Sequence, residues 1–174
     1  MFYEKLKKLI PEKNEILKNK NLQIFGNIIY NPLLWNFRRH SVSRAFAIGL
    51  FCAWIPIPFQ MILSAAIAIF LKANLPISIA LVWITNPVTM PPLFFFAYKI
   101  GSWILSSSFN NTNIELSFAY FSTAVHDIWK PFLLGCLICG AISAIIGNIL
   151  VRILWRYSII KLWNNRKKIK IEKK

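Results

Sequence analysis

Apolar side chains dominate the middle of the 174-residue chain in three long runs, whereas polar side chains gather at its two ends. The runs cover residues 45–71, 75–105 and 131–155. There is no charged residue between Arg44 and Lys72. About 20 mostly apolar residues are enough to cross the roughly 30 Å hydrocarbon core of a bilayer as a helix. The pattern therefore predicts an all-α, polytopic membrane protein.

Prolines interrupt the first two runs near their middles. A proline removes a backbone hydrogen-bond donor and clashes with the preceding helical turn. We therefore expect broken helices over about residues 41–71 and 75–105, each made of two halves that are re-entrant or kinked. The third run, about residues 131–155, is uninterrupted apart from its first residue and predicts a complete span. The expected helix breaks are Pro56, Pro58, Pro87, Pro91 and Pro92.

The distribution of charge decides between two classes of protein. The chain has 21 Lys and Arg against 6 Asp and Glu, a net charge of +15, which by itself is typical of a nucleic-acid binder. Counted by segment, however, the net charge is +6 over residues 1–44, +1 over 45–151 and +8 over 152–174. Basic ends beside apolar spans are what the positive-inside rule predicts for two cytoplasmic termini. We therefore expect a multi-pass protein of a plasma membrane and no nucleic-acid partner.

The topology follows from parity, because two cytoplasmic ends require an even number of crossings. Residues 106–129 contain no Lys or Arg, so we expect them outside the cytoplasm, with an interfacial helix over about 112–129. Lys72 favours the first broken run as the re-entrant hairpin and the second as a kinked span. The reverse assignment is the main alternative.

Three regions of the chain follow from these expectations. Residues 1–30 are a peripheral basic segment, residues 31–155 the membrane domain, and residues 156–174 a basic cytoplasmic tail.

Small residues form a stripe along the third run. Gly140, Ala144 and Gly147 recur at helical spacing, which lets two helix backbones approach closely in lipid. The stripe predicts either a homo-oligomer interface or, as we favour, packing within one chain. Cys136 and Cys139 form a C-x-x-C pair, but in an apolar span they are expected to be small buried hydrophobic residues.

The chemistry available to the membrane core is limited. No Asp or Glu lies between Glu15 and Glu115, so carboxylate acid–base catalysis and a carboxylate proton relay lack their residues there. The sequence also offers no metal-ligand constellation and no phosphate-binding loop. We therefore expect neither an enzyme nor a cofactor, although a site based on His or Lys stays open.

Polar residues at the breaks carry the functional hypothesis. Irregular backbone survives inside a membrane only where protein or a water-filled cavity surrounds it, and transporters place substrates at such breaks. We expect Gln60, Asn86 and Thr89 to line a site, with Arg39 and Arg44 attracting an anion, since arginine suits phosphate. The expected partners are the bilayer and its anionic headgroups. The function is then a carrier or lipid-handling protein for a phosphate-bearing substrate; the alternative is a non-transporting scaffold or assembly partner.

Several ordered strings carry a family resemblance. They are residues 39–51 (RHSVSRAFAIGLF), 55–61 (IPIPFQM), 74–78 (NLPIS), 86–92 (NPVTMPP) and 97–101 (AYKIG). Together they resemble the bacterial domain-of-unknown-function family 2062 over about residues 31–155. The resemblance implies a small protein of the bacterial inner membrane. It implies no activity.

Overall fold

The computed structural model describes residues 22–105 and 118–172, and all the regular elements in this part of the chain are helical. The all-α prediction is therefore confirmed. Expectations for residues 1–21 and for the start of the 112–129 segment lie outside the described residues. The elements are two 3-10 helices, η1 (Gln23–Tyr30) and η2 (Pro32–Trp35), followed by the α-helices α3 (Arg39–Ala53), α4 (Gln60–Phe70), α5 (Leu75–Val82), α6 (Met90–Ile104) and α7 (Phe118–Glu172).

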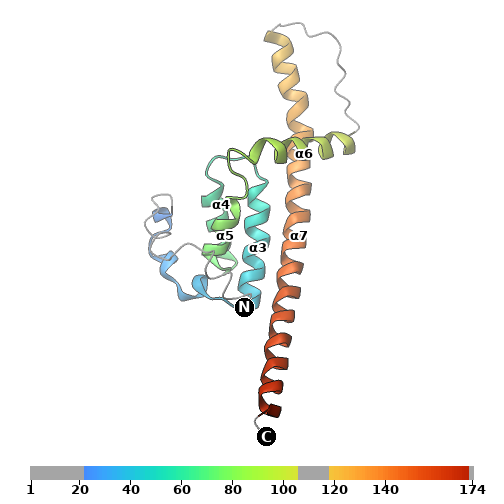
Figure 1. Ribbon diagram of the computed structural model, residues 1–174. Coiled ribbons are helices and arrows are strands. Elements are labelled where there is room, and N and C mark those ends of the chain that lie inside the picture. The colour runs from blue at the N-terminus through green and yellow to red at the C-terminus, as the bar shows by residue number, and fades with distance from the viewer. Residues whose placement is uncertain (1–21, 106–117, 173–174) are drawn as a thin grey trace.

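Helices α3, α4 and α5 stand side by side as an up-down-up bundle, and α7 runs alongside α3 (Figure 1). Helix α6 leaves this direction and lies across α7. The two loops that join α3 to α4 and α5 to α6 therefore emerge at the same end of the bundle, whereas α3 and α5 begin at the opposite end. The second broken run is thus not one kinked rod, because its two halves point in different directions.

Both breaks occur beside prolines and share one turn geometry. At the end of α3, Trp54 N donates to Phe51 O at 3.2 Å and Ile55 N donates to Cys52 O at 3.1 Å. At the end of α5, Trp83 and Ile84 make the same pair of three-residue turns. These tight turns end each helix before the prolines, which cannot donate to continue it.

Pro91 and Pro92 correct one expectation. They lie in the first turn of α6, not in the break before it. Proline is tolerated there because the first backbone N–H groups of a helix have no intrahelical partner in any case. The break itself therefore contains Pro87 alone of the three prolines predicted for it.

The opposite end of the bundle is closed by a left-handed turn. Lys72 has φ 50°, its N donates to Ile69 O, and Ala73 N donates to Ala68 O at 2.8 Å. This is the Schellman pattern, which ends a helix and reverses the chain. Asn74 then starts α5, because its side-chain oxygen accepts from Ile77 N at 3.2 Å. The hairpin between α4 and α5 is consequently short and well bonded.

The bundle interior buries apolar side chains together with several polar ones. Its polar contacts are paired: Ser64 Oγ lies 2.6 Å from Ser78 Oγ, and both residues are fully buried. Gly49 lets α3 approach α5, since a Cβ there would lie 2.6 Å from Leu81 Cβ. Ser41, in α3, departs from this pattern, because its buried hydroxyl has no hydrogen-bond partner among the described residues.

Helix α7 is the one element in the described chain that is long and apolar enough to cross a membrane, over Ile128–Lys161. It continues without interruption through Pro131, so residues 118–129 belong to the same helix as the predicted span. Its outward face exposes about half of each of several large apolar side chains: Leu137, Ile142, Ile145, Ile146, Ile149 and Leu150.

Candidate functional site

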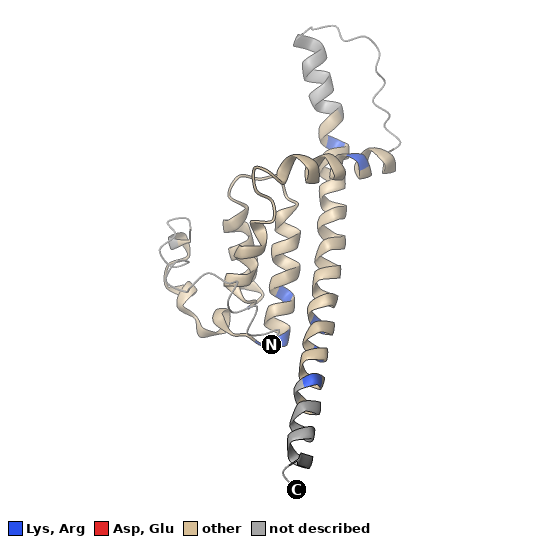
Figure 2. Ribbon diagram, viewed as in Figure 1, with Lys and Arg blue, Asp and Glu red and all other residues tan. Residues whose placement is uncertain are grey.

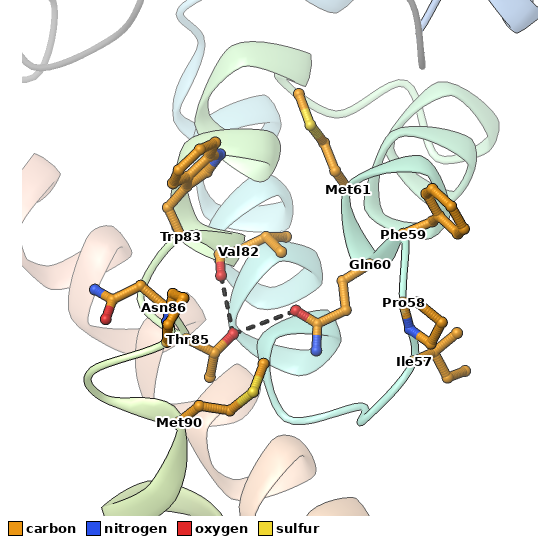
Figure 3. Close-up of a pocket in the computed structure, with 11 residues that line it drawn as sticks. Ile57, Pro58, Phe59, Gln60, Met61, Val82, Trp83, Thr85, Asn86 and Met90 are labelled. Carbon is orange, nitrogen blue, oxygen red and sulfur yellow. Dashed lines mark hydrogen bonds between the residues drawn. The ribbon is translucent and has the colours of Figure 1, made fainter.

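A cavity of about 340 Å³ lies where the two helix breaks meet (Figure 3). We call it the break cavity. One wall comes from residues 57–61, after the first break, and the other from residues 82–87 and Met90, around the second. Two residues expected to line a site, Gln60 and Asn86, do line it. Most of its other lining is apolar: Ile57, Pro58, Phe59, Met61, Val82, Trp83, Pro87 and Met90.

Gln60 and Thr85 join the two walls. The Thr85 hydroxyl donates to Gln60 Oε1 at 3.3 Å and also lies 3.0 Å from Val82 O. The Gln60 amide nitrogen donates to Ile55 O, in the loop after α3, and this carbonyl also accepts from Ile57 N at 2.8 Å. Both ends of the Gln60 side chain are therefore bonded within the chain.

Asn86 and Thr89 hold the second break together. Asn86 Oδ1 accepts from the backbone N of Val88 and of Thr89, each at 3.0 Å. The Thr89 hydroxyl donates to Ile84 O at 2.6 Å and accepts from Asn86 N at 3.0 Å. The Asn86 amide points away from the Gln60–Thr85 pair in Figure 3. These side chains satisfy the backbone that Pro87 disrupts, and Thr89 does not line the cavity.

The cations gather at the other end of the bundle. This basic end consists of Arg38, Arg39, Arg44, Lys72, Arg152 and Arg156, all of them exposed. Figure 2 shows cations near the start of α3 and on the lower part of α7. No acidic residue occurs in the sequence between Glu15 and Glu115 or between Asp127 and Glu172. The basic end therefore carries a positive charge that no carboxylate of these segments offsets.

Arg39 and Arg44 are consequently separated from the break cavity. Arg39 begins α3 and the first break follows its last residue, Ala53, a rise of about 22 Å for 15 residues. Arg44 also has a structural contact, because its Nη1 donates to Leu71 O at 3.2 Å, at the end of α4. The structure thus brings Gln60 and Asn86 together and places the two arginines one helix length away. A single site made of all five predicted residues does not form.

The register between α3 and α7 shows which residues of α7 lie beside the start and the end of α3. A Cβ on Gly140 would contact Phe51 and Trp54, and one on Gly147 would contact Leu50 and Phe46. The two helices are therefore antiparallel. Continuing the same register seven residues beyond Gly147 brings residue 154 of α7 level with the start of α3. Arg39 is then level with the segment between Arg152 and Arg156. Residues more than a hundred positions apart in sequence share one level.

The glycine contacts show what the small-residue stripe packs against within the chain. Gly140 and Gly147 face α3 of the same chain, as the intrachain alternative predicts. Sequence reasoning missed the closest crossing, between α6 and α7, where Gly101 packs on Pro131 and Gly135 on Ala97. The signal was present as a glycine in each helix, but nothing in the sequence pairs two residues 34 positions apart.

Comparison with known proteins gives one match. A family model described as "Uncharacterized protein conserved in bacteria (DUF2062)" matches residues 22–164. No curated protein and no solved structure matches the chain. The match extends over η1, η2, α3 to α6 and most of α7, so it includes the basic end and both helix breaks.

Proposed function

Since the chain belongs to DUF2062, a family of uncharacterized bacterial proteins, we propose its function from the geometry alone: it is an inner-membrane protein that binds anionic phospholipid through the basic end. In this proposal α7 crosses the membrane and the basic end lies among the headgroups of the cytoplasmic leaflet. Both termini are then cytoplasmic. Transport is not included, because Arg39 and Arg44 lie near the start of α3, whereas the first break follows its end.

The observation that carries the proposal is the common level of cations from distant segments. Arg38 and Arg39 at the start of α3 are level with Arg152 and Arg156 on α7. Each Lys or Arg near an anionic membrane surface contributes about 1 kcal/mol of attraction. Arginine also forms paired hydrogen bonds with phosphate oxygens, which adds specificity for the headgroup.

The lengths of α3 and α4 indicate how deeply the bundle enters the bilayer. Helix α3 is about 22 Å long and α4, with 11 residues, about 16 Å. A bilayer with its headgroups is about 40–45 Å thick, so one leaflet is about 20–22 Å. The α3–α4 hairpin is therefore the length of one leaflet. We propose that it is re-entrant: it enters from the cytoplasmic face, turns at the first break near the bilayer midplane and returns.

The positions along α7 give the same depth. Lys130 and Arg152 are 22 residues apart, or about 33 Å along the helix, close to the thickness of the hydrocarbon core. Gly140, which is level with the first break, lies between them at about 15 Å from Lys130 and about 18 Å from Arg152. Two independent measures, helix length and register, therefore support a break at the midplane.

The test compares the lipids that the purified protein retains. Full-length protein in nanodiscs of equal phosphatidylglycerol and phosphatidylcholine is expected to enrich the anionic lipid in native mass spectra. The pair Arg39→Gln with Arg156→Gln is expected to reduce this enrichment by about fivefold per cation, from the attraction above. The control pair, Lys99→Gln with Lys130→Gln, removes the same charge at the other end of the bundle and is expected to reduce the enrichment less, because lysine lacks the paired hydrogen bonds of arginine with phosphate. Equal losses from both pairs would contradict the proposal.

A membrane scaffold is the second candidate function. Its support is that Gln60, Thr85, Asn86 and Thr89 all bond to the chain itself. A protein that retains no preferred lipid in the nanodisc experiment would favour this candidate.

A further inference from the structure

The break cavity has the chemistry of a hydrocarbon site. Its side chains are mostly apolar, and the polar oxygens of Gln60 and Asn86 already accept hydrogen bonds from the chain. Ligand sites are typically cavities of about 300–1,000 Å³ with apolar walls, and this one is about 340 Å³. A charged or strongly polar ligand would find few unoccupied partners. An apolar ligand has no hydrogen bonds to give up when it enters such a cavity.

The rim of the cavity is strained and open. Phe59 has φ 71° and ψ 30°, a left-handed conformation that is unfavourable for a residue with a Cβ. Phe59 is 67% exposed, as is Trp83 on the opposite wall. Strained residues cluster at sites where the strain serves a function. Two exposed aromatic rings at the mouth of an apolar cavity are suited to contact a flexible chain.

The cavity also lies at a defined depth relative to the basic end. Its first wall follows directly after Trp54, which is level with Gly140, and its second wall ends at Met90, the start of α6. Helix α6 crosses α7 at Gly135. The cavity is therefore about one leaflet, or about 18 Å, from the level of Arg152.

From these observations we propose that the break cavity holds the terminal part of a phospholipid acyl chain from the leaflet whose headgroups meet the basic end. The proposal rests on the proposed function, because the depth of the cavity is measured from the basic end. A lipid in that leaflet has its phosphate in the headgroup region and its chain ends near the midplane, about 15 Å into the hydrocarbon. The headgroup would thus meet the basic end of the bundle, and the end of the acyl chain would meet the break cavity at the other end. Met61 and Met90 suit this role, since methionine adapts its shape to irregular apolar partners.

The test maps which part of the chain enters the cavity. Full-length protein is placed in nanodiscs containing phosphatidylglycerol with a photoreactive diazirine either at the terminal carbon of one chain or next to its carboxyl group. After irradiation, labelled peptides are identified by mass spectrometry. We expect the terminal probe to label the peptides that contain Met61, Trp83 or Met90. We expect the carboxyl-side probe to label the peptides around Arg39 and Arg156 instead.

Cavity-filling variants make the assignment specific. Met90→Trp is expected to reduce labelling by the terminal probe at least fivefold, and Met61→Trp, on the other wall, provides an independent variant should the first fold poorly. Leu137→Trp is the matched control, because Leu137 is 54% exposed on the outward face of α7 and does not line the cavity. Equal labelling by the two probes, or an equal reduction in Leu137→Trp, would overturn the proposal.

A neutral probe separates this inference from the proposed function. Phosphatidylcholine with the same terminal diazirine has no net negative charge to attract the basic end. If it labels the cavity as strongly as the anionic probe, the acyl-chain site stands and the headgroup preference fails. If the unmodified protein retains the anionic lipid but the terminal probe never labels the cavity, the headgroup preference stands and the acyl-chain site fails.

Discussion

The Thr85 hydroxyl donates a hydrogen bond to Gln60 Oε1 at 3.3 Å and so links the two helix breaks across the break cavity. The two residues are 25 positions apart, and each follows a helix end that prolines force open. Gln60 also donates to Ile55 O. One side chain thus connects the loop that follows α3 to the loop that follows α5. The pair ties together the irregular backbone at the two breaks.

A double-mutant cycle is expected to detect this link. Gln60→Leu and Thr85→Val each remove one partner, and each is expected to lower the free energy of unfolding by about 0.5–1.5 kcal/mol, the net value of a typical hydrogen bond. The double variant is expected to lose less than the sum, with a coupling of about 0.5–1.5 kcal/mol. The measurement is reversible denaturation in mixed micelles. Strict additivity would mean that the two side chains do not interact.

The crossing of α6 and α7 is expected to tolerate no side chain at Gly135. A Cβ there would collide with the backbone carbonyl of Ala97, and one at Gly101 with that of Pro131. Gly135→Val is therefore expected to destabilise the protein by at least about 1–3 kcal/mol, the usual cost of overpacking. The matched control is Ala141→Val, which adds volume on the exposed side of the same helix. Similar melting temperatures for the two variants, measured in the same detergent, would contradict the close crossing.

Arg39 and Arg44 are expected to differ in their effects on stability. Arg44 Nη1 donates to Leu71 O at the end of α4, whereas Arg39 is exposed at the start of α3. We expect Arg44→Ala to lower the free energy of unfolding by about 1 kcal/mol, the value of a typical hydrogen bond. Arg39→Ala should leave it nearly unchanged and affect lipid retention alone. Thermal denaturation and lipid retention are measured on the same preparations, and a reversed order of stabilities would contradict the contact.

The sequence predicted the positions of the breaks because their cause is local. Pro56, Pro58 and Pro87 act on the turn that precedes them, and that turn can be identified without tertiary structure. Pro91 and Pro92 show the limit of the same reasoning, since a proline in a first turn starts a helix and does not break one. Local chemistry could not distinguish the two cases within one proline-rich string.

The arrangement of the site depended on contacts that the sequence does not pair. Arg39 and Arg44 were expected to attract an anion to the site at the breaks, but α3 separates them from it. The direction of α6 depends on Gly101 and Gly135. The role of each glycine is evident only when the helix that packs against it is known. The polar residues at the breaks were identified correctly as residues of the breaks. Their bonds to the backbone became evident only in the structure.

The depth of the first break in the membrane tests the central claim most directly. Single nitroxide labels are placed at Phe59 and at Lys72, both exposed, in a background in which Cys52, Cys136 and Cys139 are replaced by alanine. Power-saturation electron paramagnetic resonance in liposomes then compares collisions with oxygen, which concentrates at the bilayer centre, and with a water-soluble nickel chelate. If the α3–α4 hairpin is one leaflet deep, the label at position 59 will show high oxygen and low nickel accessibility, and the label at position 72 the reverse. Nickel accessibility at position 59 equal to that at position 72 would contradict the account.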